Sequence, residues 1–108
     1  MTKKISILGT EYEYSETCEK DDPKLCGKDG YCDAYVKAIS IEVEHNKADP
    51  EAIGDLDGFQ RKVKMHEIIH AYFFEAGLQE WALDEKLVDW IAWQFPKMLE
   101  TFKEVDAI

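Results

Sequence analysis

Two histidines and a glutamate lie in one short run of the chain, His66-Glu67-Ile68-Ile69-His70. Residues four positions apart on a helix project from one face, so both imidazoles could bind a single metal ion. Zinc suits such a pair because it takes nitrogen and oxygen ligands at about 2 Å in a tetrahedral arrangement. Glu67 is placed to remove a proton from a zinc-bound water and to pass it to a leaving amine. The run therefore predicts a zinc-dependent hydrolase.

A catalytic zinc site needs a third protein ligand and keeps its fourth position open. The candidates are acids, a histidine and a cysteine elsewhere in the chain: Glu75, Glu85, Asp84, Asp89, His45 and Cys32. At about 100° per residue, Glu75 lies about 180° around the helix from His66, so we expect it to be a solvated surface acid. Glu85 is the favoured ligand because it borders the apolar face of its own helix, where a carboxylate needs a partner.

Two further acids follow the motif and have different expected roles. Asp89 lies one turn after Glu85 on the same side of the helix, so it could orient a ligand histidine through the second imidazole nitrogen. Asp84 directly precedes the periodic apolar residues and is expected to be a helix N-cap.

The elements that must position these residues can be read from the periodicity of the apolar residues. Alternation over residues 4–14 and 31–43 predicts two strands, with a polar loop at 15–30 and a connection at 44–58. A helix is predicted from about Phe59 to Gly77, which supplies a left-handed cap. After a short link at 79–81, a second helix follows Asp84 and is ended or kinked by Pro96. We expect one α+β domain over residues 1–108, with N-terminal antiparallel strands ahead of the helices.

The composition excludes several classes of partner. The chain has 23 acidic and 13 basic residues, a net charge of −10, which argues against nucleic acids and anionic membrane surfaces. It has no apolar run of the ~20 residues that a membrane span needs, and no signal peptide is recognised, so we expect a cytoplasmic protein.

Cys18, Cys26 and Cys32 form no C-x-x-C pair and are expected to be free thiols. Core packing is expected to account for most of the tryptophans, which are Trp81, Trp90 and Trp93.

The two helical segments together resemble the ImmA/IrrE-like metallopeptidases of phages and mobile elements. The resemblance covers about the C-terminal half of the chain. It rests on the H-E-x-x-H motif above, on Glu85-Lys86-Leu87-Val88-Asp89-Trp90-Ile91-Ala92 and on Phe95-Pro96. In that family the motif is paired with a later helix of the form E-x-x-A-[ND]-x-[FI]-A that ends near a proline. The resemblance implies a zincin-like fold and a phage or prophage origin. It also implies Glu85 as the third zinc ligand, Val88 in the small apolar position and Asp89 beside it.

The leading functional hypothesis is a metalloprotease that holds a peptide or protein substrate as an extra strand at the sheet edge, with residues 38–43 as the candidate edge. The donor that stabilises the oxyanion is left open among Tyr31, Tyr35, Tyr72 and His45. One alternative is a zinc-stabilised binding or regulatory module without turnover. The other is a deformylase-like amide hydrolase in which Cys32 is the third ligand.

Overall fold

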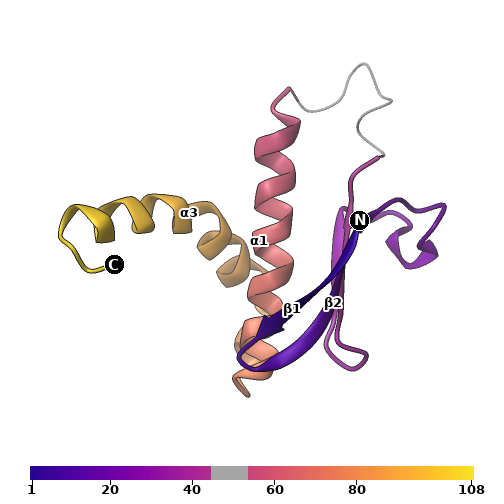
Figure 1. The fold of residues 1–108 in the computed structure, drawn as a ribbon, viewed down its shortest axis with the longest axis horizontal. Helices are drawn as coiled ribbons and strands as arrows, with labels where there is room; N and C mark the ends of the chain where they lie inside the picture. The colour runs from indigo at the N-terminus through magenta and orange to yellow at the C-terminus, as the bar shows by residue number, and fades with distance from the viewer. Residues whose placement is uncertain (45–53) are drawn as a thin grey trace.

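Four strands form a mixed sheet, and helices follow it in the chain (Figure 1). The computed structural model describes residues 1–44 and 54–108. The strands are β1 (Thr2–Ile7), β2 (Thr10–Thr17), β3 (Gly30–Asp33) and β4 (Ala38–Glu42). A 3-10 turn, η1 (Pro23–Leu25), precedes β3, and the helices are α1 (Leu56–Glu75), α2 (Gln79–Ala82) and α3 (Glu85–Glu104). The prediction of a small α+β domain is confirmed at this level.

The first predicted strand is a hairpin. The chain reverses at Leu8 and Gly9, whose φ angles of 49° and 86° are both positive, as a two-residue type I′ turn requires. The expectation of one continuous strand over residues 4–14 is therefore wrong. The inward-facing residues are odd-numbered before the turn (Ile5, Ile7) and even-numbered after it (Tyr12). That change of phase is the sequence signal for the turn.

The second predicted strand is also a hairpin, formed by β3 and β4. Its turn is closed by the Asp33 carboxylate, which accepts hydrogen bonds from the backbone N–H groups of Tyr35 (3.0 Å) and Val36 (3.2 Å). The strand order is β1-β2-β4-β3, and β2 runs parallel to β4. The predicted antiparallel sheet is therefore mixed. The predicted edge at residues 38–43 is wrong as well, because β4 lies between two strands and β3 forms the edge.

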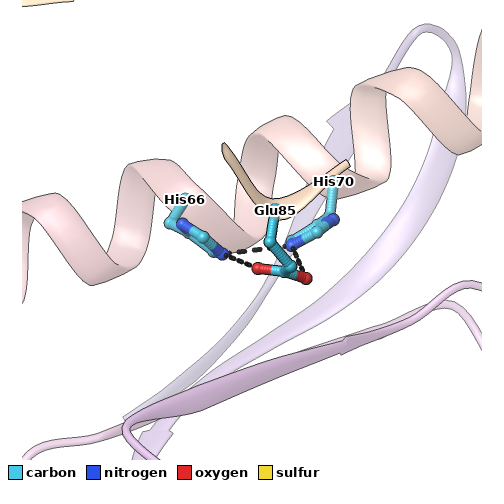
Figure 2. Close-up of side chains that lie close together, drawn as sticks. All are labelled: His66, His70 and Glu85. Carbon is cyan, nitrogen blue, oxygen red and sulfur yellow. Dashed lines mark hydrogen bonds and ion pairs between the residues drawn. The ribbon is translucent and has the colours of Figure 1, made fainter. Parts of the chain in front are cut away.

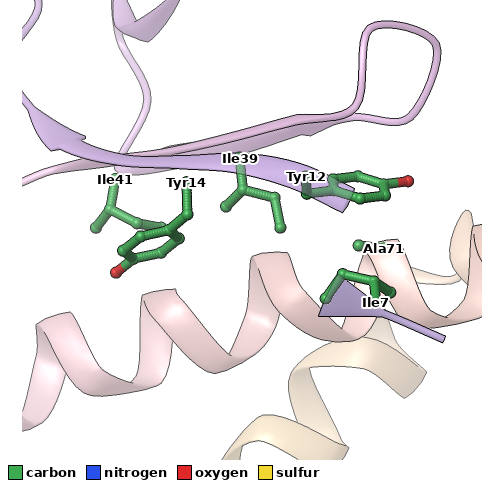
Figure 3. Packing of buried hydrophobic residues seen from close by; sticks show 6 residues of the cluster. All are labelled: Ile7, Tyr12, Tyr14, Ile39, Ile41 and Ala71. Atoms are coloured by element: carbon green, nitrogen blue, oxygen red, sulfur yellow. The ribbon is translucent and has the colours of Figure 1, made fainter. Parts of the chain in front are cut away.

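Helix α1 packs along one face of the sheet, and the core lies between them (Figure 3). Apolar side chains of the sheet point toward the helix, and Ala71 meets them with a small side chain that allows a close approach (Figure 3). The buried residues of this cluster are Ile7, Tyr12, Tyr14, Ile39, Ile41 and Ala71. This packing fixes the rotation of α1, and with it the direction in which the histidines point.

Glu75 is part of this packing and is not the solvated acid that the helical wheel predicted. Its side chain is only 12% exposed. It accepts hydrogen bonds from the Tyr12 hydroxyl (3.2 Å) and from the Lys37 ammonium group (2.8 Å). The helical wheel correctly directed Glu75 away from the histidines, but it could not show that the sheet covers that side.

Hydrogen bonds between residues close in sequence cap both ends of α1. The Asp55 carboxylate accepts from the N–H of Gly58 (2.9 Å) and caps α1, which begins a few residues before the predicted start at about Phe59. At the other end Gly77 has a φ of 77°, and the N–H of Leu78 donates to the carbonyl of Phe73 (2.9 Å), as in a Schellman motif. The predicted helix end at Gly77 is confirmed. The link expected after it is instead the short helix α2.

Helix α3 begins where predicted, because the Asp84 carboxylate accepts from the N–H of Leu87 (3.1 Å) and caps it. Pro96 lies inside α3 and does not end it, and the helix continues to Glu104. The second half of α3 extends away from α1 and the sheet (Figure 1). Core packing does not account for the tryptophans, because Trp81, Trp90 and Trp93 are 52%, 56% and 58% exposed.

None of the helices in the described parts of the chain combines the length and the apolar character needed to cross a membrane.

Candidate metal centre

Three predicted ligands converge at the junction of α1 and α3: His66 and His70 of α1 and Glu85 of the first turn of α3 (Figure 2). The two Nε2 atoms lie 3.1 Å apart. The Glu85 carboxylate oxygens lie 3.0 Å from Nε2 of His66 and 3.1 Å from Nε2 of His70. Ligands bound tetrahedrally at about 2.0 Å are separated by about 3.3 Å. The spacing of the three groups is therefore close to that around one zinc ion.

Hydrogen bonds on the far side of each imidazole determine which nitrogen is free. Nδ1 of His70 lies 2.6 Å from the carbonyl oxygen of Ala82, which can only accept, so this nitrogen carries the proton. Nδ1 of His66 lies 3.2 Å from a carboxylate oxygen of Asp89. When both rings are neutral, their Nε2 atoms present lone pairs to each other and to the Glu85 carboxylate. Such a gathering of acceptors favours a bound cation.

The Ala82 contact was missed by the sequence reasoning. Ala82 is fully buried at the end of α2, directly after the segment that the sequence predicted to be a link. A backbone carbonyl leaves no signal in a residue pattern, and only the packing of α2 against α1 brings it to His70.

Asp89, which was expected to orient one of the ligand histidines, lies behind His66. It also forms an ion pair with Lys62 of α1 (3.1 Å), and Lys62 in turn lies 4.5 Å from the ring centroid of Trp93. Burial acts to raise the pKa of Asp89, but the bonds and charges of Lys62 and His66 outweigh it and the pKa is lowered. Asp89 is therefore a carboxylate that connects the two helices while it orients the imidazole.

Glu85 is more open to solvent than the helical wheel indicated. Its side chain is 70% exposed, although both carboxylate oxygens contact the histidines. The side of the cluster away from the two imidazoles thus faces a hollow rather than the core. A small molecule could approach the three ligand atoms from that side.

Glu67 projects into the same cleft beside the histidine pair. Burial raises the pKa of Glu67 to about 7, with the charge of Glu85 adding to the increase and His66 opposing it. A carboxyl group with a pKa near neutrality can both accept and release a proton.

The cleft has two hollows of about 340 Å³ each, one on either side of the motif. The first is lined by Tyr31, Cys32, Phe74, Ala82, Leu83, His70 and Glu85, and the second by Gly27, Asp29, Phe59, Lys62, Val63 and Asp89. Four residues line both: Lys28, Gly30, His66 and Glu67. The edge strand β3 and the loop before it therefore form the wall opposite α1.

Gly30 lets β3 approach α1 at the level of Glu67. A Cβ atom at this position would lie 3.0 Å from the carbonyl oxygen of Ser40, 3.1 Å from Cγ1 of Val63 and 3.2 Å from Cγ of Glu67. The sequence reasoning missed this residue, although a glycine at the start of a strand is a known sign of close backbone approach.

We expect Gly30→Val to lower the free energy of unfolding by about 1–3 kcal/mol, because the added atoms overpack the contact between β3 and α1. Urea denaturation measures the change. Gly54→Val is the matched control, since a Cβ at Gly54 meets nothing within 4 Å. Equal unfolding midpoints for the two variants would show that β3 does not press on α1 at this point.

None of the other candidates that the structure describes belongs to the ligand group. The Cys32 side chain packs against the core, and burial raises the pKa of its thiol to about 12. Within the described residues it is not in the group with the histidines. Of the oxyanion candidates, Tyr35 is 97% exposed, and Tyr72 lines a separate apolar groove with residues of α1 and α3. Tyr31 lines the first hollow, and His45 lies outside the described residues.

Comparisons of the chain with protein-family models, with curated proteins and with solved structures find no match. The case for a function therefore rests on this chain's own residues and their geometry.

Proposed function

We propose that the chain is a zinc-dependent peptidase of the zincin type, with His66, His70 and Glu85 as zinc ligands and Glu67 as the proton-transferring base. The proposal rests on one observation above all. The Nε2 atoms of His66 and His70 and the carboxylate of Glu85 come from two different helices and lie 3.0–3.1 Å apart. Because Nδ1 of His70 donates to the Ala82 carbonyl, the lone pair on its Nε2 points at the other two groups.

The surroundings of the ligand group support this reading. A zincin-like arrangement places the motif helix against a sheet whose edge strand borders the cleft, and β3 has that position here. The residues shared with the ImmA/IrrE-like metallopeptidases include all three proposed ligands and Asp89. We propose the same family membership on this basis.

The substrate would be a peptide that pairs with the outer edge of β3, in place of the edge that the sequence predicted at residues 38–43. Backbone hydrogen bonds to an edge strand hold an extended peptide in register and leave its side chains free to enter hollows. Because Gly30 faces Glu67, the scissile bond would lie at the start of β3.

Zinc, when bound, polarises the peptide carbonyl and makes a water molecule more acidic. Glu67 takes a proton from the attacking water and later gives it to the leaving amine, so one carboxyl group serves both steps. Asp89 and the Ala82 carbonyl hold the two imidazoles in their orientations throughout.

We expect the purified protein to contain about one zinc ion per chain and to cleave members of a random peptide library. Elemental analysis measures the metal, and mass spectrometry of the library detects the products. Treatment with 1,10-phenanthroline is expected to stop cleavage, and added zinc to restore it. A protein without stoichiometric zinc would refute the proposal. Zinc bound in full without any cleavage would favour the zinc-stabilised binding module instead.

A further inference from the structure

Lys28 lies in the loop before β3, at the place where the two hollows meet. It lines both of them, together with Gly30, His66 and Glu67. Its backbone is held by a hydrogen bond from its N–H to the carbonyl of Leu25 (2.8 Å). A cation with an anchored backbone thus stands beside the groups that would carry out the reaction.

Lys28 has no carboxylate within ion-pair distance among the described residues. Other lysines form short ion pairs, for example Lys62 with Asp89 (3.1 Å) and Lys37 with Glu75 (2.8 Å). Within residues 1–44 and 54–108, no ion pair joins Lys28 to a carboxylate, and its ammonium nitrogen lies 5.9 Å from the ring centroid of Tyr31. At that distance a cation–π contact is weak. As far as the described residues go, the ammonium group is therefore open to a ligand in the cleft.

Other side-chain donors along the cleft are already engaged. The Tyr31 hydroxyl donates to the Asp22 carboxylate at 2.6 Å. The ammonium group of Lys62 is paired with Asp89 and lies over Trp93. The Cys32 thiol packs against the core.

Two ligand groups could use a cation at this place: an acidic side chain of the substrate, or the oxygen of the scissile carbonyl. The second hollow also contains Asp29 and the Asp89–Lys62 ion pair, and Glu67 and Glu85 line the first. These carboxylates would repel an acidic substrate side chain from either hollow. The junction itself lies beside Glu67, where the scissile bond would be.

We propose that Lys28 is the catalytic donor that stabilises the negative charge on the scissile carbonyl oxygen. This inference rests on the proposed peptidase function. As the water oxygen bonds to the carbonyl carbon, the electron pair of the C=O double bond moves onto the carbonyl oxygen. The Lys28 ammonium group faces that oxygen and keeps its own protons. Removal of one such donor typically lowers the rate by about 10²- to 10³-fold.

Binding of a tetrahedral anion tests this role without any substrate. The probe is phenylphosphonate, whose charged oxygens imitate the tetrahedral centre, and calorimetry would measure its affinity for the zinc-loaded chain. Lys28→Met is expected to weaken binding by about 10- to 100-fold, as for loss of a hydrogen bond to a charged group, while Lys28→Arg retains most of the affinity. Zinc content is expected to be the same in all variants.

Lys3→Met is the matched control, because β1 lies at the opposite edge of the sheet from β3 and the substitution removes the same charge. Cleavage of the peptide library gives a second readout, for which Lys28→Met is expected to be about 100-fold slower than the parent. Unchanged phosphonate affinity and unchanged cleavage in Lys28→Met would overturn the role of Lys28 and leave the zinc peptidase intact. A parent chain that binds no zinc would overturn both proposals.

Discussion

Glu67→Gln is expected to retain about one zinc ion per chain and to slow peptide cleavage by about 10²- to 10⁴-fold. Glutamine has nearly the same shape as glutamate, so it can keep the packing against Gly30. Its amide cannot accept the proton of the attacking water, and the reaction loses its base. Elemental analysis and the rate of library cleavage measure the two effects separately.

The same replacement of glutamate by glutamine at a position outside the cleft gives the control. Glu80 lies on α2, is exposed and lines neither hollow of the cleft, so Glu80→Gln is expected to cleave at the parent rate. A Glu67→Gln variant that cleaves as fast as the parent would show that another group activates the water. A variant that loses its zinc would show instead that Glu67 supports the metal.

The second large effect is expected at Glu85, where the loss concerns the metal rather than the reaction. Glu85→Gln replaces a charged ligand with a weak neutral one. It should reduce zinc affinity by about 10²- to 10³-fold, because three protein ligands together provide the free energy of zinc binding. Asp89→Asn acts only through the orientation of His66 and should cost about 10- to 100-fold. Competition with a chromophoric chelator measures both affinities.

Asp84→Asn is the control for these two variants, because it removes one acidic charge at the start of the same helix while asparagine remains a good N-cap. If Glu85→Gln binds zinc as tightly as Asp84→Asn, Glu85 is not a ligand. The deformylase-like alternative predicts that outcome together with a thiolate charge-transfer band in the cobalt-substituted protein. A carboxylate ligand gives no such band. The distance data favour the carboxylate, since Glu85 and not Cys32 lies with the histidines in the described structure.

The strands show how a local pattern can identify a type of structure and still mistake its extent. Both predicted strands are strand-forming sequences, but each contains a turn, at Leu8-Gly9 and after Asp33. The shift in alternation after Ile7 was a readable signal for the first turn. The parallel pairing of β2 with β4 had no such signal, because it depends on where the chain returns after the loop that contains η1.

Features set by neighbours along the chain could be predicted from the sequence alone. The four-residue spacing of His66 and His70 places them on one face wherever a helix forms, and Gly77 and Asp84 mark helix ends through hydrogen bonds to nearby residues. The helical wheel also directed Glu75 away from the histidines. These features follow from the fixed geometry of the helix, which does not depend on the rest of the fold.

Only the tertiary structure decided which groups meet across elements. Three such features depend on how α2, α3 and the loop before β3 pack against α1. They are the contact of Glu85 with both imidazoles, the Ala82 carbonyl behind His70 and the position of Lys28 beside Glu67. A residue pattern records which face of an element is apolar. It does not record which turn of one element lies opposite which turn of another, because side-chain packing between distant segments selects that register.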